Sequence, residues 1–165
     1  MSRTSLKTFN CSVAQTLDII GDKWTLLIIR DAFLGVSTFS EFQRRLNVAR
    51  NVLTDRLTVL VENQIFERRQ TKPGVERYSY HLSERGHALF PVLIGLMQWG
   101  DKWIFGSEGE PMQMLDRRKN APIQQVAVMS RDGHFLKDED VRFVPGPGAV
   151  RSKGRQQVAP KKRPL

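Results

Sequence analysis

Polar side chains with directed hydrogen-bonding groups are concentrated in residues 49–63, where the hydrophobic spacing predicts a helix. The apolar residues of this range recur on one predicted face: Val52, Leu53, Leu57, Leu60 and Val61. The polar residues that point away from that face or lie at its flank are Arg50, Asn51, Thr54, Asp55 and Thr58. Asparagine can bridge N6 and N7 of adenine, arginine can pair with O6 and N7 of guanine, and a carboxylate can accept from the cytosine amino group. The pattern therefore predicts a helix that reads base edges in the major groove, with an ordinary solvated helix face as the alternative.

Cationic side chains on both sides of this helix are candidates to hold the phosphate backbone. Arg44 and Arg45 end the preceding predicted helix, and Lys72 and Arg77 belong to a predicted hairpin that follows. Contacts to phosphates position a protein on the duplex without reading its sequence. The alternatives are that the two arginines complement the C-terminal dipole of their helix and that the hairpin charges only add solubility. For Arg56, a phosphate contact and a structural salt bridge are equally good interpretations.

Residues capable of catalysis or metal binding form no recognisable constellation. The three histidines, His81, His87 and His134, are scattered at spacings unlike those of metal ligands. Cys11 is the only thiol, and no general base lies near it in the sequence. Because no glycine-rich phosphate-binding loop is present either, we expect no enzymatic activity, no metal site and no cofactor.

The charge balance favours a polyanionic partner. The 165 residues include 26 Lys and Arg against 17 Asp and Glu, for a formal net charge of +9. A basic soluble chain of this kind usually binds nucleic acid, here double-stranded DNA. Hydrophobic residues make up 40%, enough for the core of one ordinary domain. No apolar run approaches the ~20 residues that cross a bilayer, so we expect a cytoplasmic protein with no membrane partner.

The elements that must position these side chains follow a winged helix-turn-helix order. Helices are predicted over residues 13–20, with Ser12 as a cap, and over residues 23–34, 38–46 and 49–63. Thr38 and Glu41 form a capping box at the third of these. Two strands within residues 65–82 then make a hairpin, the wing, and a long amphipathic helix bent at Pro91 runs over residues 83–105. The predicted fold class is therefore mainly α with a small β-hairpin wing (α+β).

The C-terminal third of the chain carries weaker signals. Strands are predicted at residues 124–129, 134–136 and 141–144, with a turn at residues 131–133. We interpret residues 122–148 as a small β-appendage. Residues 149–165 contain six Lys and Arg, two Pro, one Gly and no acid, which is typical of a disordered basic tail.

Several motifs, in the right order, are similar to one known family. They comprise the run from Cys11 through residues 17–28, then residues 39–42, 51–57 and 80–86, and finally residues 91–93 with Trp99-Gly100. Over residues 9–104 the chain resembles HxlR-type regulators, relatives of the MarR winged-helix repressors. The resemblance implies a bacterial or archaeal homodimeric transcriptional regulator, either repressor or activator. Two departures are Ser12 and Arg50, where many members have proline, and the cysteine-pair tail of some longer relatives is missing.

The implied homodimer would bind a pseudo-palindromic operator through residues 9–105, the DNA-binding and dimerisation domain. Apolar residues of the first and last helices exceed what one small core needs and are the predicted dimer contacts: Val13, Leu17, Leu89, Leu93, Leu96 and Trp99. An intramolecular core is the competing interpretation.

Two kinds of signal are candidates for control. Cys11, just before a helix start, is a candidate sensor of oxidants, because some regulators of this type sense them through a cysteine in this region; a quiet small hydrophobe is the alternative. Trp24, Trp99 and Trp103 are candidates to line a small-molecule effector cavity, or simply to pack in a core. The principal rival function is a winged helix that binds a protein partner instead of DNA.

Overall fold

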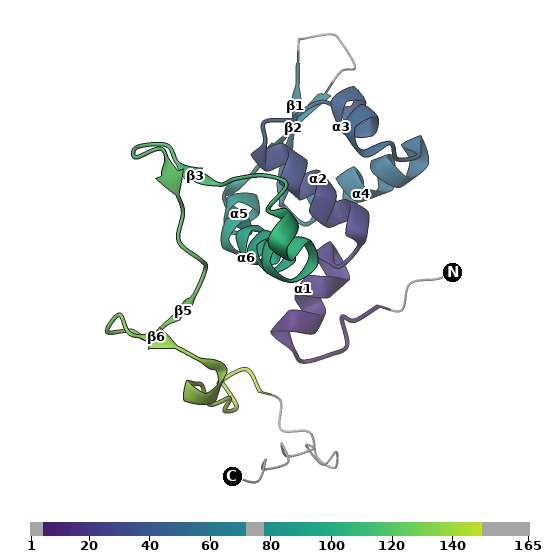
Figure 1. Ribbon diagram of the computed structural model, residues 1–165. Coiled ribbons are helices and arrows are strands. Elements are labelled where there is room, and N and C mark those ends of the chain that lie inside the picture. The colour runs from purple at the N-terminus through teal and green to yellow at the C-terminus, as the bar shows by residue number, and fades with distance from the viewer. Residues whose placement is uncertain (1–4, 72–77, 150–165) are drawn as a thin grey trace.

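The computed structural model describes residues 5–71 and 78–149. Four helices, a hairpin and two further helices form the body (Figure 1). In chain order these are α1 (Ser12–Ile20), α2 (Lys23–Phe33), α3 (Phe39–Leu46), α4 (Arg50–Glu62), β1 (Phe66–Gln70), β2 (Tyr78–Leu82), α5 (Glu84–His87) and α6 (Phe90–Gly100). This is the winged helix-turn-helix predicted from the sequence, mostly helical with a small antiparallel hairpin.

Local capping sets where the helices begin. The carboxylate of Asp22 accepts from the backbone N–H of Trp24 at 3.0 Å and so caps α2. Thr38 and Glu41 form the predicted capping box at α3, and the hydroxyl of Thr38 donates to the Glu41 carboxylate at 2.6 Å. This bond is the main reason that the pKa of Glu41 lies below its ordinary value. At α1 the prediction was wrong, because the cap residue is Cys11 and Ser12 is already helical.

The core lies between α2, α3, α4 and the start of β1. Its fully buried large side chains include Ile28 of α2, Phe42 of α3, Leu53 and Leu57 of α4 and Phe66 of β1. The rings of Phe42 and Phe66 stack at 6.3 Å between centroids, which fixes the hairpin to α3. This packing holds α3 and α4 as the two helices of the helix-turn-helix.

The hairpin is joined to the helices at both of its ends. β1 and β2 pair antiparallel from Phe66 opposite Leu82 to Gln70 opposite Tyr78. The backbone N–H of Tyr80 donates to the carbonyl of Ser37 at 2.7 Å, which ties β2 to the start of α3. At the other end, the hydroxyl of Ser83 donates to the carbonyl of Gln64 at 2.5 Å, lies 3.2 Å from the carbonyl of Ile65, and accepts from the N–H of Gly86 at 3.1 Å.

The predicted single helix over residues 83–105 is in fact interrupted. α5 ends at His87, two residues form a turn, and α6 begins at Phe90 with Pro91 in its first turn. Proline has no N–H and its ring clashes with the preceding turn, so it starts a new helix here instead of bending a continuous one. A π-helix, η1 (Asp101–Phe105), and a short 3-10 turn, η2 (Gly106–Glu108), extend α6.

Residues 109–149, here called the arm, leave the end of η2 and run along the body without forming a second core (Figure 1). They contain two minimal hairpins, β3 (Leu115–Asp116) with β4 (Ala121–Pro122) and β5 (Val128–Met129) with β6 (Phe135–Leu136), and a 3-10 turn, η3 (Asp138–Asp140). The predicted turn at residues 131–133 is present, with Gly133 at φ 88°. The β3–β4 hairpin was not predicted, and the predicted strand at residues 141–144 is absent. The predicted tail lies, apart from residue 149, outside the described residues.

Candidate nucleic-acid interface

The exposed face of α4 carries the predicted base-reading residues. Leu53, Leu57 and Leu60 point into the core and are at most 1% exposed. The residues on the outer face are all exposed, as predicted: Arg50, Asn51, Thr54, Asp55 and Thr58. The buried leucines hold one side of α4 to the core, and the exposed polar residues lie on the other side. The helix itself packs next to α3 (Figure 1).

Two of these side chains have local partners that limit what they can do. The guanidinium of Arg50 lies 5.1 Å from the ring centroid of Phe39, which orients it at the first turn of α4. The hydroxyl of Thr54 donates to the backbone carbonyl of Arg50 at 2.9 Å, so its proton is used within the helix and its oxygen is left to accept. Asn51, next to Arg50 at the helix start, is the side chain that offers both a donor and an acceptor to a base edge.

A buried carboxylate behind this face was missed by the sequence reasoning. Asp31 of α2 has no exposed side-chain surface, and its Oδ1 accepts from Nη2 and Nε of Arg30 at 2.8 and 3.0 Å. Its Oδ2 accepts from Nε of Arg45 on α3 at 3.2 Å. Arg45, predicted as a phosphate anchor, therefore also has a structural role, because it joins α3 to α2. Arg44 beside it is exposed at the end of α3.

For Arg56 the structure shows a salt bridge, the second of its two interpretations. Its Nε lies 3.9 Å from Oδ1 of Asp22, the carboxylate that caps α2, and its side chain is only 25% exposed. The pair joins the middle of α4 to the start of α2. Arg56 thus orients the helix from behind, away from its outer face.

The wing adds cations that the sequence reasoning did not select. Lys72 and Arg77 lie outside the described residues, so their predicted contacts stay predictions. Arg68 of β1 is exposed, lies 4.2 Å from the ring centroid of Tyr78 and lines a groove of about 200 Å³ with Thr58 of α4. The signal was the Arg68-Arg69 pair in a predicted strand. Arg69 is engaged instead with Glu67 at 2.8 Å.

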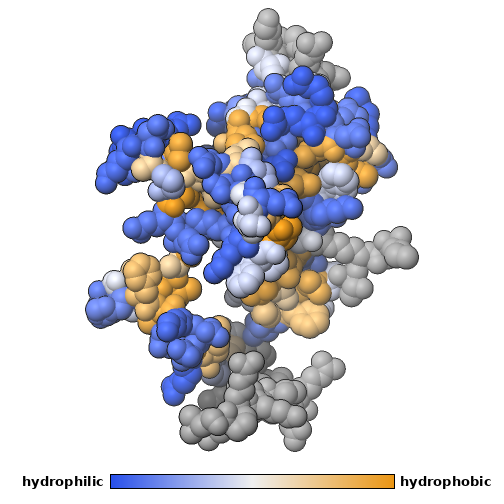
Figure 2. Space-filling view, in the orientation of Figure 1, coloured by the Kyte–Doolittle hydropathy of each residue, from blue (hydrophilic) through white to orange (hydrophobic). Residues whose placement is uncertain are grey.

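The predicted dimer residues separate into two groups. Val13 and Leu17 of α1 and Leu96 and Trp99 of α6 are exposed, and Trp99 is 59% exposed. Apolar side chains gather over this end of the body in Figure 2. Leu93 is buried in its own chain, so its assignment to the dimer surface is corrected and the competing interpretation, an intramolecular core, holds for it. Leu89 is partly buried against the core, and its dimer contact stays a prediction.

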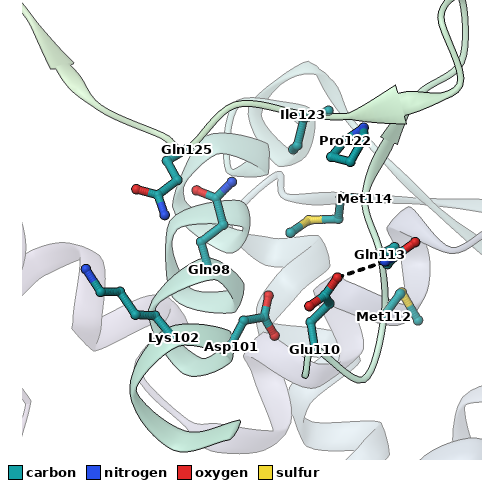
Figure 3. Close-up of a pocket in the computed structure, with 10 residues that line it drawn as sticks. All are labelled: Gln98, Asp101, Lys102, Glu110, Met112, Gln113, Met114, Pro122, Ile123 and Gln125. Atoms are coloured by element: carbon teal, nitrogen blue, oxygen red, sulfur yellow. Dashed lines mark hydrogen bonds between the residues drawn. The ribbon is translucent and has the colours of Figure 1, made fainter. Parts of the chain in front are cut away.

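The structure describes both candidate sensing elements, the Cys11 thiol and a hollow that could take a small molecule. Cys11 is a free, exposed thiol at the start of α1. The described ranges contain no cluster of three or more His, Cys, Asp and Glu that could hold a metal ion. A hollow of about 340 Å³ lies between the end of α6 and the arm and is lined by Gln98, Asp101, Lys102 and Met114 among others (Figure 3). None of the three tryptophans lines it, and Trp24 packs against the core.

The family is decided by comparison with known proteins. The model of the HxlR-like helix-turn-helix matches residues 19–108. The chain belongs to this family. It is 36% identical over 137 residues to an HTH-type transcriptional regulator of Mycobacterium tuberculosis, across 83% of this chain and 87% of the relative. It is 32% identical over 94 residues to the HTH-type transcriptional regulator YdeP of Bacillus subtilis, across 56% and 73% of the two chains. This HxlR-like chain is thus a transcriptional regulator with a helix-turn-helix domain.

Solved structures agree with this assignment. The transcription factor PA1607 superposes with a TM-score of 0.80 at 38% identity, covering 87% of this chain and 100% of that one. The redox regulator HypR in its reduced form superposes with a TM-score of 0.52 at 29% identity, covering 56% and 92%. No helix among the described residues is both long and apolar enough to cross a membrane.

The lengths of these alignments distinguish two kinds of relative. The 137 residues aligned to the mycobacterial regulator exceed the 108 residues that precede the arm, so this alignment includes part of the arm. The family model ends at residue 108, where the arm of this HxlR-like protein begins. The arm is therefore an addition to the common family domain that some relatives share.

Proposed function

We propose that this protein is a homodimeric, sequence-specific DNA-binding regulator that acts in the cytoplasm on a pseudo-palindromic operator and has no catalytic role. In this proposal α4 lies in the major groove. Its side chains Arg50, Asn51, Thr54, Asp55 and Thr58 face the base edges. The observation that carries it is the exposed polar face of α4 on a helix whose opposite face is fully buried.

The phosphate contacts come from the elements on either side of α4. Arg44 at the end of α3 and Arg68 on β1 are exposed on the two flanks, and Lys72 and Arg77 of the wing are assigned the same role from the sequence. Arg45 contributes through its outer surface, since its guanidinium is also bonded to Asp31. Such contacts supply affinity that falls with salt, whereas the face of α4 supplies specificity.

In the proposed dimer, the contact between protomers is formed by Val13, Leu17, Leu96 and Trp99. These residues belong to α1 and α6 and are exposed in the single chain. Two recognition helices related by two-fold symmetry would read half-sites one helical turn apart.

Fluorescence anisotropy tests the proposal directly. DNA from upstream of the chain's own and adjacent genes is titrated at two salt concentrations, with scrambled DNA as the control. We expect affinity for one fragment at least ~1,000-fold above the control. Equal, steeply salt-dependent binding to both would leave only a basic surface, and no binding would favour the protein-partner alternative.

A thiol-based response through Cys11 is the second candidate function. The thiol is exposed at the start of α1, the helix that carries two of the proposed dimer contacts. The structural likeness to a redox regulator is in keeping with this role. If Cys11 senses oxidants, treatment with peroxide changes operator affinity of the wild type and leaves that of Cys11→Ser unchanged; equal responses would exclude the sensor.

A further inference from the structure

The arm exposes more apolar surface than a free segment of this length sustains. Its β5–β6 hairpin and the residues that follow expose Val128, Met129, Phe135, Phe143 and Val144, with Phe135 at 72% and Phe143 at 93%. Hairpins with strands of two residues are not stable in water alone. A surface of this kind marks an interaction site.

The arm is nonetheless tied to its own body at two points. The side-chain amide of Gln98 on α6 donates to the carbonyl of Gln124 at 3.0 Å and accepts from the N–H of Val126 at 2.7 Å. Figure 3 shows Gln98 on α6 facing this stretch of the arm. Near the other end, the amide of Asn10 donates to the carbonyl of Gly148 at 3.1 Å. The five exposed apolar residues named above lie between these two ties.

Open space separates the segment between the two ties, residues 127–147, from the body. In Figure 2 the β5–β6 hairpin stands away from the helices, with its apolar side chains in view. An exposed apolar segment that is held at both ends beside open space is available to a partner. The end of the body next to it exposes a second apolar set in the same chain: Val13, Leu96, Trp99, Trp103 and Ile104.

The arm begins beside this second apolar set. Trp103 and Ile104 belong to η1, and the arm starts directly after η1 and η2. The arm of each protomer therefore departs from the face that the proposed dimer uses. A two-fold interface presents the same surfaces on both copies, so one protomer's arm can reach the other's helices and the reverse.

We propose that the occupant is a second copy of this chain: the segment over residues 127–147 of each protomer wraps the α1–α6 end of the other. The two copies are interlocked, and Phe135 and Phe143 become buried against the partner's helices. This inference rests on the homodimer of the proposed function. It adds that the arm, which lies beyond the family domain, is an exchanged dimerisation element.

Photo-crosslinking between isotopically distinct copies tests the exchange. Full-length Phe143→p-benzoylphenylalanine protein is prepared in ¹⁴N and ¹⁵N forms, mixed in denaturant, refolded together, irradiated, digested and examined by mass spectrometry. We expect crosslinked peptides that join a light and a heavy chain, with acceptors in α1 or α6. The matched control is Arg118→p-benzoylphenylalanine, at the β3–β4 tip, where the side chain is 89% exposed but carries no apolar role; it should give few mixed products.

Sedimentation equilibrium supplies an independent measurement. In the full chain, Phe135→Ser combined with Phe143→Ser should raise the dimer dissociation constant at least ~100-fold, because two large apolar side chains per protomer, four per dimer, lose their burial. Arg118→Ser should change it by less than about threefold. Both phenylalanines are exposed in the protomer, so the body should keep its circular dichroism spectrum.

The possible outcomes distinguish a failure of the arm exchange from a failure of the proposed homodimer. If the wild type is a dimer but crosslinks join only peptides of one isotope, or the double variant dimerises normally, the exchange is overturned and the dimer stands. If the purified dimer gives no crosslinks from residue 143, the arm belongs to another partner and the inference is also overturned. A monomeric wild type would refute both the exchange and the homodimer.

Discussion

Replacement of Asp31 by asparagine should destabilise the helix-turn-helix far more than its single-atom change suggests. The Asp31 carboxylate is fully buried and accepts three hydrogen bonds, two from Arg30 and one from Arg45, at 2.8 to 3.2 Å. In Asp31→Asn the negative charge is lost, one oxygen becomes a donor that faces a cation, and the tie between α2 and α3 is broken.

The magnitude follows from the exposure of the partners. Hydrogen bonds to a charged group contribute about 1.5–3 kcal/mol each, and breaking a wholly buried ion pair costs about 3–5 kcal/mol. Here the arginine side chains are 36% and 44% exposed, so both cations regain part of their hydration when the carboxylate is removed. We therefore expect the free energy of unfolding to fall by about 2–4 kcal/mol.

Urea unfolding followed by tryptophan fluorescence measures this loss, at one fixed protein concentration because a dimer's stability depends on concentration. Asp55→Asn is the matched control, since Asp55 is exposed on α4 and its change should cost less than about 0.5 kcal/mol. The cycle Asp31→Asn, Arg45→Gln and the double variant isolates the coupling of this pair. A loss below about 0.5 kcal/mol in Asp31→Asn would refute the argument that the buried carboxylate holds α3 in place.

Three further predictions concern the interface and its supports. Asn51→Ala should lower affinity for the operator by about 1–3 kcal/mol while affinity for scrambled DNA is unchanged; an equal loss on both DNAs would contradict base reading. Thr38→Ala should cost about 1 kcal/mol of stability at neutral pH through the loss of the α3 cap. Because the pKa of Glu41 is lowered mainly by the Thr38 hydroxyl, its contribution is complete above the ordinary glutamate pKa of about 4.3 and lost as the pH falls through the lower folded value. The melting-temperature gap between wild type and Thr38→Ala should therefore narrow in acid, and a constant gap would contradict this. Gly86→Ala should destabilise by about 1–3 kcal/mol, since a Cβ there would clash with the backbone carbonyl of Ile65; unchanged urea unfolding would argue against this packing.

Features that depend on neighbours in the sequence were predictable. The Thr38–Glu41 capping box depends only on two residue types three positions apart. The buried and exposed faces of α4 follow from the spacing of its apolar residues. Asn51 was placed correctly on the outer face for the same reason. The spacing of apolar residues over a few helical turns decides which side of a helix is buried, even when the segment that packs against it is not known.

Features that depend on distant partners were not predictable. Asp31 lies 14 residues before Arg45, and nothing in the local pattern of α2 distinguishes it from a solvated acid. Leu93 belongs to a helix apolar enough to suggest a dimer seam, yet only tertiary packing shows that it faces its own body. Strands of two residues, as in β3 and β4, carry no alternation to read.

The hydroxyl of Ser83 couples the orientation of the hairpin to that of α5. One side chain holds the carbonyls before β1 and the first turn of α5, so a tilt of α5 would turn the base of the hairpin with it, with Ser83 as the pivot. Strands of five residues at ~3.3 Å each reach roughly 17 Å from that pivot, so a 5° tilt of α5 would displace the far end of the hairpin by about 1.5 Å. In the proposed DNA complex a shift of that size, half a hydrogen bond's length, would separate a cation of the hairpin from a phosphate while α4 stays in the major groove.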